Sequence, residues 1–133
     1  MKYLAELKAL NLPRNKFAIF ASGPMAIRNL RENQDIDVIV KEPLWKELSK
    51  KHNIILKNNG KTKCIEIRNI EIFNDWKPWF DDINELIDTA DIIQNIRFVK
   101  LTYVLEWKKA MNREKDIRDI KIIEDYMQGH STV

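Results

Sequence analysis

Two aspartates one residue apart are the side chains in this sequence best suited to chemistry. Asp35 and Asp37 stand at the head of an apolar, β-branched run that continues to Val40. In an extended strand alternate side chains share a face, so both carboxylates point the same way. At about 3.3 Å per residue they lie roughly 6 to 7 Å apart and repel by about 2 to 3 kcal/mol at an effective dielectric of about 20. Because a divalent cation such as Mg²⁺ or Mn²⁺ reverses the sign of that interaction, the pattern predicts a metal site.

A turn of small residues precedes the pair. The apolar run 17–21 predicts a strand, and Pro24 is suited to the first turn of a helix reaching about Leu30. Between them, Ser22 offers a hydroxyl donor and Gly23 permits close approach to a backbone. Backbone N–H groups at a helix start attract anions, so this turn is a candidate phosphate-binding site.

A third carboxylate is expected on a neighbouring strand, as a further metal ligand or as a general base. Glu71 is the first choice, because Ile70 and Ile72 on either side of it are expected to face the core. Glu66 has nearly the same local pattern and Asp75 follows closely, so both stay open as alternatives.

The ordered combination of these features resembles a known signature. Ser22-Gly23, a helix, and then Asp35-Ile36-Asp37 opening a strand resemble the nucleotidyltransferase superfamily, the DNA-polymerase-beta-like fold in its minimal form. The segment 105–120, which contains Arg113-Glu114-Lys115-Asp116 and Asp119, is similar to the Arg-x-Lys-Asp-x-x-Asp helical segment of small bacterial nucleotidyltransferases.

The resemblance implies an activity and a set of roles. A nucleoside monophosphate would move from a nucleoside triphosphate such as ATP to a hydroxyl acceptor, with Mg²⁺ or Mn²⁺ required. It implies that Asp35 and Asp37 bind the metal and that Glu71 is the third ligand or the base. Ser22, Gly23 and Lys108 would bind phosphate. The acceptor stays open among a small molecule, a protein and an RNA.

Length and composition limit the class of protein to which this chain can belong. The chain has 133 residues, 32% of them charged and 44% apolar, with a formal net charge of +3, which favours one soluble domain. Without an apolar stretch of membrane-spanning length or a signal-peptide pattern, we expect a cytoplasmic protein with no membrane association. The lone Cys64 excludes an internal disulfide and a cysteine metal cage.

Periodicity and turn residues predict an α/β (α+β) domain over 1–133, with a core at 14–99, C-terminal helices at 100–128 and a tail at 129–133. We expect a mixed sheet with helices on one face and the carboxylates on the other, plus a C-terminal helical pair that ends at Gly129. The residues between 92 and 99 predict a short edge strand. The other expected strands are 17–21, 35–40, 54–56, 63–67 and 70–73, and the other expected helices lie at 4–10, 24–30, 42–51 and 83–87.

Two other classes of function stay open. The first is a catalytically inactive domain of this fold that binds nucleotide or a partner protein, for example in a toxin–antitoxin pair. The order Ser22-Gly23 and the glutamate at position 71 favour it, because Gly-Gly or Gly-Ser and an aspartate are commoner in the superfamily. The second is a small RNA-binding module that uses the basic C-terminal helices. Since so small a chain forms only part of a cleft, a homodimer or a helical partner protein stays open as the source of the other wall.

Overall fold

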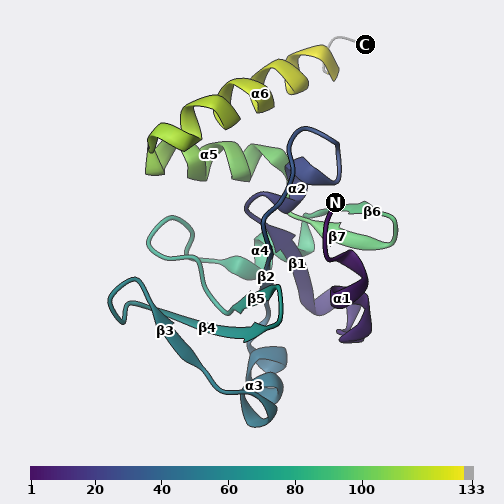
Figure 1. Ribbon diagram of the computed structural model, residues 1–133, viewed down its shortest axis with the longest axis vertical. Coiled ribbons are helices and arrows are strands. Elements are labelled where there is room, and N and C mark those ends of the chain that lie inside the picture. Colours follow the sequence, from purple (N-terminus) through teal and green to yellow (C-terminus); the bar gives the residue numbers. More distant parts are fainter. Residues whose placement is uncertain (131–133) are drawn as a thin grey trace.

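A seven-stranded mixed sheet is the centre of the molecule (Figure 1). The computed structural model describes residues 1–130, and the strand order is β3-β4-β5-β2-β1-β7-β6. β2 pairs in parallel with β5 and β1 with β7, whereas the remaining neighbours are antiparallel. The strands are β1 Phe17–Phe20, β2 Ile36–Val40, β3 Ile55–Lys57, β4 Thr62–Ile67, β5 Ile70–Phe73, β6 Asp91–Ile93 and β7 Ile96–Phe98.

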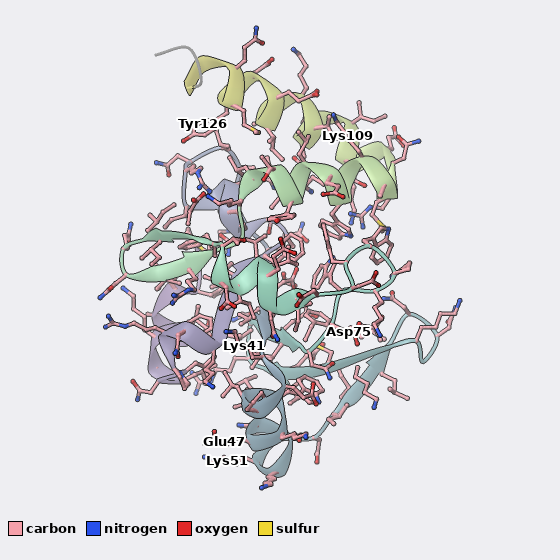
Figure 2. All side chains as sticks on the ribbon, turned by 180° about the vertical axis from the view of Figure 1, so that it is seen from behind. Lys41, Glu47, Lys51, Asp75, Lys109 and Tyr126 are labelled. Atoms are coloured by element: carbon pink, nitrogen blue, oxygen red, sulfur yellow. The ribbon has the colours of Figure 1, made fainter. Side chains whose placement is uncertain are left out.

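Six α-helices accompany the sheet in residues 1–130. α5 and α6 stack at one end of the molecule and α3 lies at the other, where Glu47 and Lys51 point outward (Figures 1 and 2). None of the helices in the described part of the chain has the length and apolar character needed to cross a membrane. The helices are α1 Leu4–Ala9, α2 Gly23–Ala26, α3 Glu42–Lys51, α4 Ile83–Asp88, α5 Leu101–Met111 and α6 Glu114–His130, and a short 3-10 helix covers Arg14–Lys16.

Helices cover both faces of the sheet, so the expectation of helices on one face only is wrong. Ile36, Val38 and Val40 of β2 pack in a core with α1 and α3. Ile39, on the opposite face of the same strand, packs in a second core with α4, α5 and α6. All four residues of β1 are buried as well. Central strands that are apolar on both faces need cover on both, which explains the second layer of helices.

Asp35 and Asp37 therefore share a face with a helical layer. Asp37 is the register partner of Phe20 on β1, and Phe20 belongs to the second core. Both aspartates are only partly exposed. The carboxylates thus lie at the border of a packed region and not on an open face.

Three local predictions are corrected by the structure. The helix expected to reach Leu30 ends at Ala26, and Asn29 adopts a left-handed conformation with φ of 61°. The expected edge strand within 92–99 is a hairpin of β6 and β7, of which β7 lies inside the sheet beside β1. The final helix does not end at Gly129, because α6 runs through it to His130. Of the expected tail, residues 131–133 lie outside the described chain.

The remaining elements match the sequence pattern closely. The predicted strands before and after the Asn58-Asn59-Gly60 turn form the β3–β4 hairpin, and β5 follows as expected. α5 and α6 form the predicted C-terminal helical pair, with the break at Asn112, whose φ is 48°. β4 pairs with β5, and β5 pairs with β2, which places the predicted acidic residues on adjacent strands.

Candidate metal site on strands β2 and β5

The predicted carboxylates come together at the head of β2. Ligand oxygens of Asp35, Asp37 and Glu71 lie within 4.8 Å of one another. Asp37 and Glu71 are direct register partners on the parallel strands β2 and β5, and Asp35 is the residue before β2 begins. Oxygens on opposite sides of one Mg²⁺ are about 4.2 Å apart, twice the bond length of about 2.1 Å. The three side chains therefore need little movement to bind one ion, and an all-oxygen donor set suits Mg²⁺ or Mn²⁺.

Of the three candidates for the third carboxylate, Glu71 is the one grouped with the aspartate pair. Glu66 on β4 is the register partner of Glu71, so Glu66, Glu71 and Asp37 form one row across three strands. Glu66 also clusters with Cys64 and Glu71. Asp75 lies on the loop after β5 (Figure 2), where its carboxylate accepts a hydrogen bond from the Lys77 backbone N–H at 3.2 Å.

The environment of Asp37 disfavours its charged form. Burial and, to a smaller extent, the neighbouring Asp35 raise its pKa to about 7 against the opposing effect of Lys57. Within residues 1–130 neither Asp35 nor Asp37 has a side-chain hydrogen bond or an ion pair. A charged Asp37 therefore has no direct hydrogen-bond or ion-pair partner at the place where a cation would supply positive charge.

Lys57 is the functional candidate that sequence reasoning missed. Its ammonium forms an ion pair with Glu66 at 2.8 Å and contacts Glu71 as well. Burial lowers its pKa, but the hydrogen bond to Glu66 and the nearby negative charges raise it overall. The available signal was the Asn58-Asn59-Gly60 turn, because this hairpin pairs Lys57 with Thr62 and so puts Lys57 on the face of Glu66.

The predicted phosphate turn lies beside the head of β2. β1 and β2 are antiparallel with Phe20 opposite Asp37, and the chain then turns at Ala21, whose φ is 56°. Gly23 is required for packing, because a Cβ there would lie 2.1 Å from Cγ2 of Ile19. Ser22 makes no side-chain capping bond, and α2 has only 4 residues. Phosphate binding by Ser22 and Gly23 stays a prediction.

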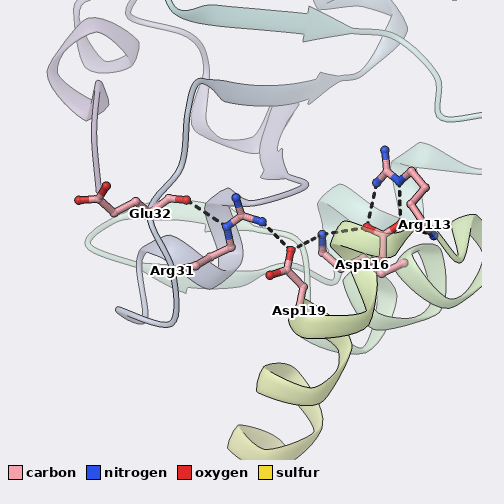
Figure 3. Close-up of polar contacts among 6 residues, drawn as sticks. Arg31, Glu32, Arg113, Asp116 and Asp119 are labelled. Carbon is pink, nitrogen blue, oxygen red and sulfur yellow. Dashed lines mark hydrogen bonds and ion pairs between the residues drawn. The ribbon is translucent and has the colours of Figure 1, made fainter.

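Lys108 lies in a buried ion cluster. Its Nζ is 2.9 Å from Asp119 Oδ2 and 3.6 Å from Asp116 Oδ1, and all three residues are buried. Asp119 also pairs with Arg31 at 2.5 Å (Figure 3). In the described chain the ion pairs of Lys108 are with these two aspartates. None is with the carboxylate trio, the group formed by Asp35, Asp37 and Glu71. Its predicted contact with phosphate is untested.

The residues of the Arg-x-Lys-Asp-x-x-Asp segment form hydrogen bonds that hold the C-terminal helices in place. Arg113 donates to Asp116 through its backbone N–H and its guanidinium, at the start of α6 (Figure 3). Burial raises the pKa of Asp116, but the hydrogen bonds from Arg113 outweigh it and lower the pKa overall. Asp119, one turn further along α6, accepts hydrogen bonds from Arg31 and Lys108. This segment therefore fixes α5 and α6 to the chain that leads into β2.

A buried asparagine completes that connection. Asn33 donates from its side chain to the backbone carbonyls of Lys2 and Asp35, at 2.9 and 3.1 Å, and accepts from the Lys2 backbone N–H. Arg31 and Asn33 were not predicted as site residues. Together they position Asp35, the first residue of the candidate metal site.

A cavity of about 1120 Å³ lies beside this connection. Gln34, the chain neighbour of Asp35, is part of its wall. The cavity is large enough for a phosphate-bearing ligand, and its charged lining is mixed. The cations are Lys2, Arg31, Arg113, Lys115 and Arg118, and the acids are Glu32, Glu114 and Asp119.

An aromatic cluster borders the row of carboxylates on the β1 side. The ring of Phe20 lies 4.8 Å from that of Trp76, which in turn lies 5.3 Å from Trp107. The indole N–H groups of Trp76 and Trp107 are buried and have no hydrogen-bond partner within residues 1–130. Trp79 packs against Trp107 but is 37% exposed.

Comparison of the chain with protein-family models, with curated proteins and with solved structures finds no match. A function for this chain is therefore inferred from the residues of the site.

Proposed function

We propose that this protein is a metal-dependent nucleotidyltransferase with a DNA-polymerase-beta-like fold, which moves a nucleoside monophosphate from a nucleoside triphosphate to a hydroxyl acceptor. The observation that carries the proposal is the convergence of Asp35, Asp37 and Glu71, whose ligand oxygens lie within 4.8 Å of one another. Their placement beside the Ser22-Gly23 turn supports it, because the register of β1 and β2 brings that turn toward the same strand end.

The reaction is an in-line displacement at the α phosphorus. The acceptor hydroxyl oxygen forms the new bond to phosphorus, the bond to the bridging oxygen of the β phosphate breaks, and pyrophosphate leaves. The proton of the hydroxyl passes to a carboxylate, for which Glu71 is the candidate. A bound Mg²⁺ or Mn²⁺ supplies positive charge for the phosphate oxygens.

The protein residues have distinct tasks in this scheme. Asp35 and Asp37 bind the cation from one face of β2, and their near approach favours one shared ion. The Arg31–Asp119 ion pair and the Asn33 hydrogen bonds hold the start of β2 in place. The exposed Trp79 is available to stack on a base.

The test is transfer of radioactive label from each of the four α-labelled nucleoside triphosphates. The protein is incubated with Mg²⁺ and, separately, with total RNA, a protein extract and a small-molecule extract. We expect labelling of one fraction by the wild type and none by the Asp35→Asn/Asp37→Asn variant. The control is Glu47→Gln, an exposed carboxylate on α3 (Figure 2), which leaves labelling unchanged. Equal labelling by the double variant, or no labelled fraction with any nucleotide, contradicts the proposal.

A second candidate, nucleotide binding without turnover, is favoured by one observation. Lys108 is paired with two buried aspartates, Asp116 and Asp119, which argues against its assisting transfer. In that case a nucleoside triphosphate with Mg²⁺ raises the melting temperature through Asp37, while no acceptor is labelled. A partner protein such as an antitoxin would then be sought by co-purification.

A further inference from the structure

Lys57 lies where a nucleotide-binding cation would be needed. It is the last residue of β3, its side chain is 33% exposed, and its ammonium contacts Glu66 and Glu71. Glu71 is also a member of the carboxylate trio. One glutamate is therefore shared between the lysine and the candidate metal site.

The charges around Lys57 do not balance. Asp35, Asp37, Glu66 and Glu71 contribute four carboxylates, and Lys57 is the cation that the described chain pairs with this group. Asp37 is only partly exposed and has neither a hydrogen bond nor an ion pair in residues 1–130. Even with Lys57 in place, the group therefore keeps a net negative charge that a bound cation would offset.

Resting on the nucleotidyltransferase function proposed above, we propose that Lys57 is a residue that binds the phosphates of the nucleoside triphosphate, and that Glu71 and Glu66 hold it in the absence of metal. When a cation binds Asp35, Asp37 and Glu71, the lysine loses its contact with Glu71. Glu66, which is 44% exposed and outside the trio, keeps the ammonium beside the site. There the ammonium donates to an oxygen of the triphosphate.

The side chain and its strand suit this role. A lysine has a flexible stem with three rotatable donors and is a common binder of phosphate as a point charge. β3 is the edge strand of the sheet, so movement at its end disturbs few other contacts. The partners of Lys57 on the same face of the hairpin are small or half-exposed, since Thr62 lies directly opposite.

A purely structural salt bridge makes a different prediction. If Lys57 only joins β3 to β5, its removal weakens the hairpin and leaves the intrinsic metal affinity unchanged or lower. If Lys57 competes with metal and then binds nucleotide, its removal tightens metal binding and weakens nucleotide binding. These opposite changes separate the two roles.

The experiment measures two dissociation constants for the full chain. Mn²⁺ alone is titrated by electron paramagnetic resonance, and Mn²⁺ with a non-hydrolysable ATP analogue is titrated by calorimetry. The variants are Lys57→Met and Lys57→Arg. The control is Lys63→Met on β4, an exposed lysine opposite Leu56 and therefore on the other face of the same hairpin.

For Lys57→Met we expect Mn²⁺ to bind tighter by roughly fivefold and the analogue to bind weaker by roughly tenfold, the scale of losing one unit charge at a partly exposed site. Lys57→Arg keeps nucleotide affinity near that of the wild type, and Lys63→Met changes neither constant. If Lys57→Met fails to fold, as judged by circular dichroism, Lys57→Gln replaces it with the same expectations.

The outcomes distinguish the two proposals. Wild-type protein that does not bind Mn²⁺ overturns the metal site itself and the role of Lys57 with it. Wild-type protein that binds Mn²⁺ and the analogue, with both constants unchanged or both weakened in Lys57→Met, overturns the role of Lys57 and leaves the nucleotidyltransferase proposal standing.

Discussion

Asp37 of β2 and Glu71 of β5 are direct register partners on neighbouring parallel strands. Two carboxylates in that relation repel each other, and Asp35 adds a third within ligand distance. The three carboxylates lie at the end of a strand that has a packed core on each face, and burial there disfavours charged groups. In the metal-free protein, this repulsion and burial make the free energy of unfolding depend on pH.

The first prediction concerns stability against pH. The pKa of Asp37 is raised from its ordinary 3.8 to about 7 in the folded chain. A raised carboxyl pKa contributes stability below the unfolded value, and that contribution is lost as pH rises through the folded value. Between pH 4 and 8 in EDTA, the wild type should lose up to about 4 kcal/mol relative to Asp37→Asn. Urea unfolding of both proteins across this range measures the difference.

Asp125→Asn is the control for that comparison, because Asp125 pairs with Lys121 on the exposed surface of α6. Its stability should follow the wild type at every pH. A constant difference between the wild type and Asp37→Asn from pH 4 to 8 would show that Asp37 titrates normally.

Much of the site could be predicted from local sequence, and the reason is the period of a strand. Asp35 and Asp37 share a face because side chains alternate, and no tertiary information is needed for that. The choice of Glu71 over Glu66 followed the same alternation, but both satisfy it. Only the β2–β5 register, which depends on long-range pairing, places Glu71 directly beside Asp37.

Other features depend on contacts between distant segments. Lys57 reaches the carboxylates because β3 folds back on β4, and Asp119 meets Arg31 across 88 positions of sequence. The helical spacing of the lysine-rich segment predicts that Lys108 points inward. It does not predict that two aspartates surround the ammonium, because these come from the following helix. The second helical layer could not be predicted because two aspartates at the head of a strand indicate an open face, whereas Ile39, on the same face of β2, is buried in a core with residues of α5.

The second prediction tests why residue 23 is a glycine. In Gly23→Ala the new Cβ would lie 2.1 Å from Ile19 Cγ2, so β1 and α2 must separate. We expect a loss of about 1 to 3 kcal/mol in the free energy of unfolding. Chemical denaturation of the variant gives the value.

The matched change is Gly129→Ala, where a Cβ meets nothing within 4 Å near the end of α6. It should be neutral or stabilise by up to about 1 kcal/mol through helix propensity. Equal effects of the two substitutions would contradict the packing explanation.

The third prediction concerns the buried cluster between α5, α6 and the chain before β2. Asp119→Ala removes the carboxylate that joins Arg31 to Lys108 and leaves Lys108 with Asp116 at 3.6 Å. We expect a loss of about 3 kcal/mol, the scale for breaking a buried ion pair. Thermal and urea unfolding measure it.

For comparison, Glu124→Ala breaks the exposed pair between Lys109 of α5 and Glu124 of α6, 3.2 Å apart. Its cost should stay below about 1 kcal/mol. If the two variants are equally stable, the Asp119 cluster does not fix the helical pair.

The most direct test of the metal site is equilibrium binding of Mn²⁺ to the wild type and to Asp35→Asn, Asp37→Asn and Glu71→Gln at pH 8, followed by electron paramagnetic resonance. Three carboxylates that share one ion predict a single site in the wild type and affinity reduced by at least about tenfold in each variant. Glu47→Gln should bind as the wild type does. Mn²⁺ binding that is absent from the wild type, or that survives unchanged when Asp37 is replaced, would contradict the account.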